Sequence, residues 1–164
     1  MRTPICKICA WKEDLCPTCN KKFVDGGLSH LDIEISKILY RINESINISN
    51  ADFSKAYDIG EIVIIESSNP GLLIGKKGKI ISLLSSALQK KVRVIRENTD
   101  IKTKIADIVA PITLNGINYF WSQGKEVTKI RLKKNAGQKL YVGEETLKRI
   151  ISEWLKKDVE IVYE

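Results

Sequence analysis

Four cysteines stand close together at the start of the chain, in the pattern C-x2-C-x6-C-x2-C: Cys6, Cys9, Cys16 and Cys19. Each CxxC turn can direct two sulfur atoms at one point, and four thiolates are the usual ligands of a tetrahedral structural zinc ion. Two disulfides are the alternative, which a reducing cytoplasm disfavours. The pattern therefore predicts one structural zinc ion that has no open coordination position for catalysis.

The cysteine-rich segment is too short to form a hydrophobic core of its own. We expect it to pack against the rest of the chain through four apolar residues: Ile5, Ile8, Trp11 and Leu15. Because a small metal site of this kind couples binding to folding, the ion is expected to hold this segment in its folded form.

A second stretch whose residues could bind a ligand, GLLIGKKGKIISLL, covers residues 71–84. Two glycines enclose two lysines, with an isoleucine before them and a third lysine after: Ile74, Gly75, Lys76, Lys77, Gly78 and Lys79. Glycines permit the close approach of a phosphate backbone, lysines supply positive charge, and the start of the following helix offers unpaired N–H groups. A Walker loop is excluded, because GxxxxGK followed by Ser or Thr is missing. Taken alone, GKKG also fits a helix connection with solvated lysines.

Charge and composition narrow the function further. The formal charge of +7 and the pI of about 9.2 favour an acidic partner. No apolar run approaches the roughly 20 residues of a membrane span, and the N-terminus lacks the apolar region of a signal peptide, so we expect a cytoplasmic protein without membrane contact. With a single histidine, His30, and its cysteines committed to metal, the chain has no recognisable catalytic set, and we expect no enzyme activity.

The elements that must position the glycine-lysine stretch can be read from hydrophobic periodicity. An amphipathic helix follows the candidate cap Ser29, with Asp32 three residues on. A strand is predicted at residues 61–66, and residues 53–59 are a weaker strand candidate. An apolar turn at residues 72–74 precedes GKKG, a helix follows at residues 80–88, and Val92 and Val94 mark a closing strand.

This order, with GKKG between two helices, resembles that of the type II KH domain, whose GXXG loop clamps single-stranded nucleic acid. The resemblance implies that RNA contacts fall on the six residues of the glycine-lysine stretch, Ile74 to Lys79, and on Arg93 of the last strand.

The second half of the chain repeats the first at a constant shift of 67 residues. Ile80 and Leu84 correspond to Leu147 and Ile151, and VRVI at residues 92–95 corresponds to VEIV at residues 159–162. A helix at residues 101–111 and a strand pair with its turn at residues 122–125 precede the repeat. In place of GKKG stands VGEET, residues 142–146, whose two carboxylates should repel phosphate. The second copy is therefore predicted to be degenerate.

The whole chain resembles the tandem KH region of NusA-like transcription factors, and in particular small archaeal relatives with an N-terminal zinc knuckle. The expected fold is α+β, with a zinc knuckle at residues 1–27, a KH domain at residues 28–98 and a degenerate KH-like domain at residues 99–164. Each of the two KH-like domains is expected to have helices on one face of a three-stranded sheet. The resemblance implies single-stranded RNA binding in transcription elongation or termination, with RNA polymerase or the ribosome as a further partner. A ribosome or pre-rRNA assembly factor and a protein adaptor built on KH scaffolds are the alternatives.

Overall fold

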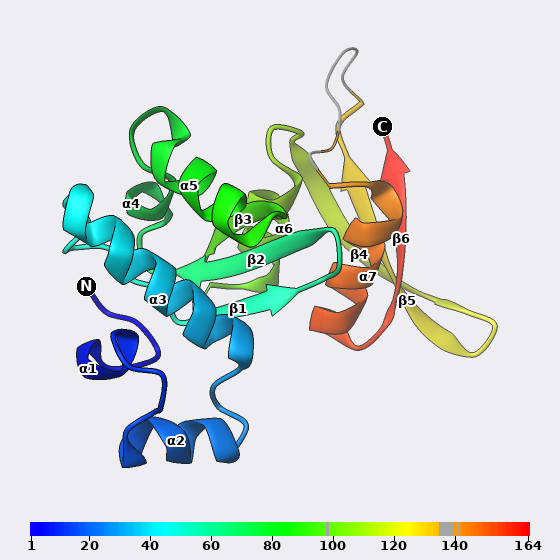
Figure 1. Cartoon of the computed structure of the whole chain (residues 1–164). Coiled ribbons are helices and arrows are strands. Elements are labelled where there is room, and N and C mark those ends of the chain that lie inside the picture. The colour runs from blue at the N-terminus through cyan, green and yellow to red at the C-terminus, as the bar shows by residue number, and fades with distance from the viewer. Residues whose placement is uncertain (98, 135–139, 141) are drawn as a thin grey trace. The chain divides into compact units, whose positions relative to one another are not determined.

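The computed structural model describes residues 1–97, 99–134, 140 and 142–164. The chain divides into two units, Met1–Asn98 and Thr99–Glu164. Each unit has its own three-stranded sheet (Figure 1). In the described ranges, no helix combines the length and the apolar character that crossing a bilayer requires.

The first unit begins with two short helices and continues with an α-β-β-α-α-β series. Its elements are α1 (Lys7–Ala10), α2 (Pro17–Val24), α3 (His30–Ser45), β1 (Lys55–Asp58), β2 (Ile62–Ser67), α4 (Pro70–Ile74), a 3-10 turn η1 (Lys76–Gly78), α5 (Lys79–Leu88) and β3 (Lys91–Arg96). In the sheet, β2 lies between β1, to which it is antiparallel, and β3, to which it is parallel. The strand expected at residues 61–66 lies one residue further along the chain.

Helix α3 begins at a capping box that also holds the sheet. The Ser29 hydroxyl accepts a hydrogen bond from the Asp32 N–H at 3.1 Å, and the Asp32 carboxylate accepts one from the Ser29 N–H at 3.0 Å. The second carboxylate oxygen of Asp32 accepts from the N–H of Ala56 in β1 at 2.8 Å. One buried side chain therefore caps the start of the helix and fixes the first strand against it.

The core of the first unit lies between the sheet and the helices α3, α4 and α5. Alternate residues of β2 and β3 face the helices, and they pack with one stripe of each helix: Val63, Ile65, Val92, Val94, Ile35, Leu39, Leu73, Ile80 and Leu84. Strand alternation and helical spacing thus direct the same set of apolar residues into one layer. This layer fixes the start of α5 next to the end of α4.

The second unit has the same kind of sheet. Its elements are α6 (Ile101–Val109), β4 (Leu114–Ser122), β5 (Lys125–Leu132), α7 (Glu144–Leu155) and β6 (Asp158–Tyr163). Strand β5 is central, antiparallel to β4 and parallel to β6. Gln123 and Gly124 form the hairpin turn with φ values of 51° and 76°, as a two-residue type I′ turn requires. The predicted α+β class, with two mixed three-stranded sheets and an N-terminal cysteine cluster, is confirmed.

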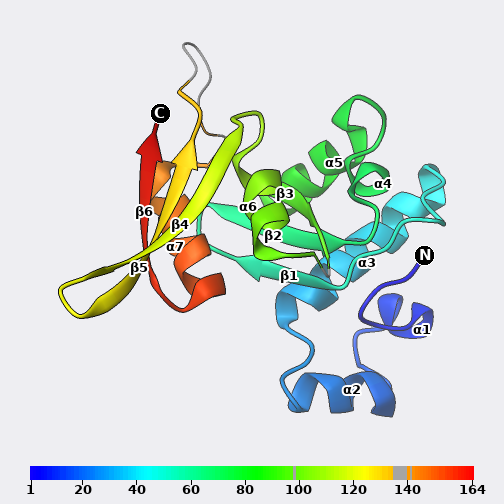
Figure 2. The same ribbon diagram turned by 180° about the vertical axis from the view of Figure 1, so that it is seen from behind.

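The N-terminal segment packs on α3, but with a different surface from the one expected. Ile5 is buried and Leu15 half-buried, as predicted, whereas Ile8 is 63% and Trp11 48% exposed. The contact with α3 is made instead by a small cluster that includes Cys9, Ala10, Cys19, Leu28 and Tyr40. Helix α1 has a single turn, so only part of it can be covered by α3: Cys9 and Ala10 are buried there, and Ile8 and Trp11 are not. Figure 2 shows α1 beside α3 from behind.

Candidate metal centre and nucleic-acid interface

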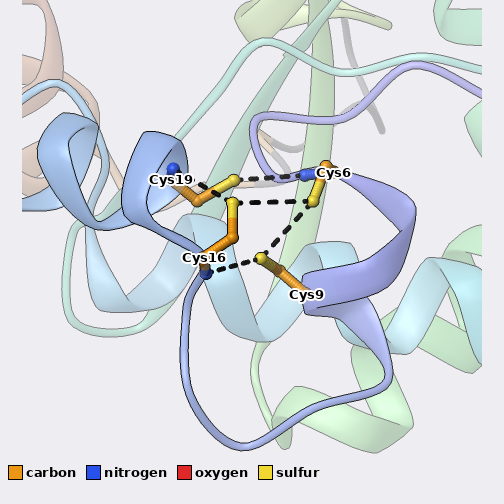
Figure 3. Close-up of side chains that lie close together, drawn as sticks. All are labelled: Cys6, Cys9, Cys16 and Cys19. Carbon is orange, nitrogen blue, oxygen red and sulfur yellow. Dashed lines mark hydrogen bonds between the residues drawn. The ribbon is translucent and has the colours of Figure 1, made fainter.

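The four cysteine side chains converge between α1 and α2 (Figure 3). Their sulfur atoms all lie within 4.8 Å of one another. The Sγ atom of Cys6 is 3.4 Å from that of Cys9 and 4.0 Å from that of Cys16, so neither pair is at bonding distance. A tetrahedral ion with metal–sulfur bonds of about 2.3 Å needs sulfur atoms about 3.8 Å apart. The cluster therefore fits one tetrahedral metal ion.

Backbone N–H groups point at these sulfur atoms and favour their charged form. The N–H of Cys16 donates to the sulfur of Cys9 at 3.1 Å, and the N–H of Cys6 donates to that of Cys19 at 3.4 Å. The N–H of Cys19 lowers the pKa of the Cys16 thiol to about 7. Burial raises the pKa of Cys9 to about 12 and also raises that of Cys19. Burial of these two thiols opposes their ionisation, and a bound cation would favour it.

The GKKG loop lies between α4 and α5, and both of its glycines have positive φ angles, which residues with a Cβ atom rarely adopt. Gly75 adopts φ 77° and ψ 175°, a combination open to glycine alone. A Cβ atom there would lie 2.5 Å from Cγ1 of Ile80 and 3.0 Å from its backbone nitrogen. Gly78 is left-handed, with φ 72°, and so is Lys77, with φ 55°. The first glycine is thus required both by conformation and by its contact with α5.

The loop exposes its charges at the start of a helix. Lys76, Lys77 and Lys79 are all exposed. Helix α5 begins at Lys79, and its N-cap residue, Gly78, provides no side-chain hydrogen bond. The first N–H groups of α5 and the positive end of the helix dipole are therefore presented together with three ammonium groups. This arrangement suits an anion such as a backbone phosphate.

Two apolar side chains flank the loop. Ile74, at the end of α4, is 37% exposed, and Leu83, one turn into α5, is 41% exposed. Sequence reasoning placed Ile74 at the interface and did not single out Leu83. Helical spacing could have indicated that Leu83 is exposed. Ile80 and Leu84 are four apart on the buried stripe, whereas Leu83 is four residues after the exposed Lys79 and lies on the same face as that lysine.

Arg93 does not join this group. It lies in the edge strand β3, in register with Ile64. Val92 and Val94 on either side pack against the helices, so alternation places the half-buried Arg93 on the other face of the sheet. The structure brings together the six loop residues from Ile74 to Lys79, and Arg93 remains a separate prediction.

The corresponding stretch of the second unit has a different structure. Glu144 and Glu145 form the first turn of α7, which starts two residues earlier in the repeat than α5 does. Val142, which corresponds to Gly75, is buried, and Gly143 is the N-cap residue. Lys148 pairs with Glu144 at 3.5 Å and with Glu145 at 3.8 Å. The carboxylates thus occupy the helix start that phosphate would use.

Comparison with known proteins agrees with this geometry. Residues 37–113 match the model of the KH domain family, and the first unit has the α-β-β-α-α-β order of the type II KH fold. Among solved structures, the chain is similar to "Crystal structure of APE1850", with a TM-score of 0.53 and 16% identity over 78% of this chain and 96% of that one. The likeness shows the fold and extends beyond the KH segment. No curated protein matches the chain.

Proposed function

We propose that this protein binds single-stranded RNA through the KH domain and is a binding protein rather than an enzyme. The observation that carries the proposal is the loop geometry, in which Gly75 fits against Ile80 and the three exposed lysines stand at the uncapped start of α5. The exposed Ile74 and Leu83 provide apolar surface for bases beside the phosphate-binding loop.

Titration of the full chain with short single-stranded RNA at several salt concentrations tests the proposal. Phosphate contacts make the affinity fall with salt, with a slope of roughly 0.7 per contact in a log–log plot. Replacing Lys76 and Lys77 with Asp should weaken binding by about 100-fold and flatten the slope. The matched control replaces the exposed pair Lys133 and Lys134, which lies outside the loop. Equal losses in the two variants would show that net charge, and not the loop, determines binding.

We further propose that the cysteine cluster holds one structural zinc ion. Four sulfur ligands at tetrahedral spacing satisfy zinc completely and leave no position for water, so the ion supports the fold of residues 1–27. Elemental analysis of protein expressed in zinc-replete medium should find one equivalent. A value well below one would contradict this assignment.

For the cellular role, we propose a NusA-like factor in transcription elongation or termination, which rests on the tandem arrangement of two mixed sheets after a cysteine knuckle. An RNA crosslinking map from cells separates this role from the alternatives. Crosslinks along nascent transcripts support it. Crosslinks to rRNA favour a ribosome or pre-rRNA assembly factor, and no crosslinks favour a protein adaptor built on KH scaffolds.

A further inference from the structure

Three hollows adjoin one another on the first unit, between the GXXG loop and the cysteine-rich segment. The loop hollow, about 370 Å³, is lined by residues 46–51 together with Leu72, Lys76, Lys79 and Ile80. The bridge hollow, about 350 Å³, includes Met1, Arg2 and residues 49–52. The knuckle hollow, about 480 Å³, is lined by Met1, Lys7, Trp11, Tyr40, Asn43, Glu44 and Ser49.

Shared residues place these three hollows next to one another, and together they are called the track. Ser49 lines all three, Asn50 and Ala51 line the first two, and Met1 lines the last two. The segment between them is held in place, because the Asn43 side chain accepts a hydrogen bond from the N–H of Ile48 at 2.9 Å. The track is thus a preformed surface that starts at the phosphate-binding loop.

The chemistry of the track differs from one hollow to the next. At the loop hollow, the ammonium groups of Lys76 and Lys79 adjoin apolar walls and the exposed amide of Asn50. At the bridge hollow, Arg2 is paired with Asp52 at 3.1 Å and with Glu97 at 3.5 Å. At the knuckle hollow, exposed Lys7 and the half-exposed indole of Trp11 stand together. Phosphates match the lysines, and a base matches the indole.

Trp11 is an unusual residue to leave exposed on so short an element. It is the C-cap residue of the four-residue helix α1 and is not part of the buried cluster that packs on α3, although it lines the knuckle hollow beside Tyr40. The backbone next to it is anchored, since Lys37 of α3 donates to the carbonyl of Lys12 at 3.0 Å. A large aromatic ring on a fixed backbone, beside a lysine, is the arrangement that stacks on a single-stranded base. Glu44 in the same hollow disfavours phosphate, so a base is the better fit on its side.

We propose that RNA bound at the GXXG loop continues across residues 46–52 to the cysteine-rich segment, where Trp11 stacks on a base and Lys7 contacts a phosphate. The inference rests on the proposed RNA-binding function and extends it, because it gives the knuckle a direct role in binding. A KH loop alone holds about 4 nucleotides, so the track predicts a longer RNA footprint.

The test compares random-sequence RNA pools of about 5 and about 12 nucleotides on the full chain, the shorter of which little more than fills the loop site. Trp11→Ala should weaken binding of the longer RNA by about 10-fold and leave the shorter RNA unaffected. Trp11→Phe should retain most of the affinity. The matched control is Ile8→Ala, which removes an exposed apolar side chain from the same helix but from outside the hollow. Zinc content and thermal midpoint establish that each variant is folded.

Lys7→Glu is a second test that leaves the indole in place. It should weaken binding of the longer RNA and leave binding of the shorter RNA unchanged. Tryptophan fluorescence should be quenched by the longer RNA and not by the shorter one, and Trp11→Ala should abolish this quenching. Equal affinity of wild type and Trp11→Ala for the longer RNA would overturn the track and leave the exposed indole to a protein partner. If wild type binds neither RNA, the proposed function itself fails.

Discussion

The helix–turn–strand pairs α5–β3 and α7–β6 are built alike, although they share little sequence. Gln89 and Lys156, 67 residues apart, end the two helices in the left-handed conformation with φ 54° and 56°. The Ser85 hydroxyl donates to the carbonyl of Lys90 at 2.6 Å, and the Ser152 hydroxyl donates to that of Lys157 at 2.8 Å. Strands β3 and β6 both run parallel to their central strand.

The two units differ at the other end of the helix. In the first unit a glycine-enclosed loop exposes lysines, whereas in the second Glu144 and Glu145 continue the helix by two residues. Acidic residues in a first helical turn are stabilising, and lysines there are not. The difference teaches that the helix–turn–strand frame serves stability in both units, while the first unit lacks the acidic helix start of the second and presents lysines there instead.

The largest expected difference between the units concerns the metal. Chelation should unfold residues 1–27, because structural zinc contributes roughly 10–16 kcal/mol in small metal-dependent domains. Hydrogen exchange should accelerate in α1 and α2, while β2 and β5 keep their protection, since neither strand contributes to the cluster that packs the cysteine-rich segment on α3. The double variant Cys9→Ser and Cys19→Ser is the control, because chelator should not change it further. Loss of protection in β2 would show that the knuckle is part of the KH core.

The next largest effect is expected from replacing two aspartates that cap helices. Replacing Asp32 with Ala should lower the free energy of unfolding by about 2–3 kcal/mol, because the N–H groups of Ala56 and Ser29 lose their acceptor in a buried site. Asp100 caps α6 through the N–H of Thr103 at 3.3 Å, but it is exposed to water. Asp100→Ala should therefore cost much less. Denaturant unfolding of both variants measures the difference, and equal losses would contradict the second role of Asp32.

These two aspartates also show what sequence can and cannot predict. The cap of α3 was readable, because Ser29 and Asp32 stand at capping-box spacing before an apolar stripe. The bond from Ala56 to Asp32 joins residues 24 apart and depends on the packing of a strand on a helix, which no local pattern specifies. The exposure of Ile8 and Trp11 escaped prediction for the same reason, since apolar type does not say which face is covered.

Exchanging the charge of the second unit sharpens the comparison of the two helix starts. Glu144→Lys with Glu145→Lys should raise RNA affinity by no more than about 3-fold, because Val142 is buried at the position of Gly75 and phosphate cannot approach as closely. The same change should destabilise the unit by about 1 kcal/mol, because two carboxylates leave the helix N-terminus and their pairs with Lys148 are lost. RNA titration and thermal unfolding measure the two effects. A gain near 100-fold would mean that charge alone makes the site.

The smallest predicted effect tests the shared frame. Gln89 and Lys156 hold the left-handed C-cap position at which glycine is preferred, and a residue with a Cβ atom there costs about 1–2 kcal/mol. Glycine removes that strain but adds about 0.4–1 kcal/mol of chain entropy to the unfolded state, so each substitution to Gly should gain only about 0.5 kcal/mol. Because the dihedral angles at the two caps nearly coincide, the gains should be equal within error when each variant is unfolded in denaturant. A gain in one unit with a loss in the other would show that the two frames, alike in backbone, are held by different forces.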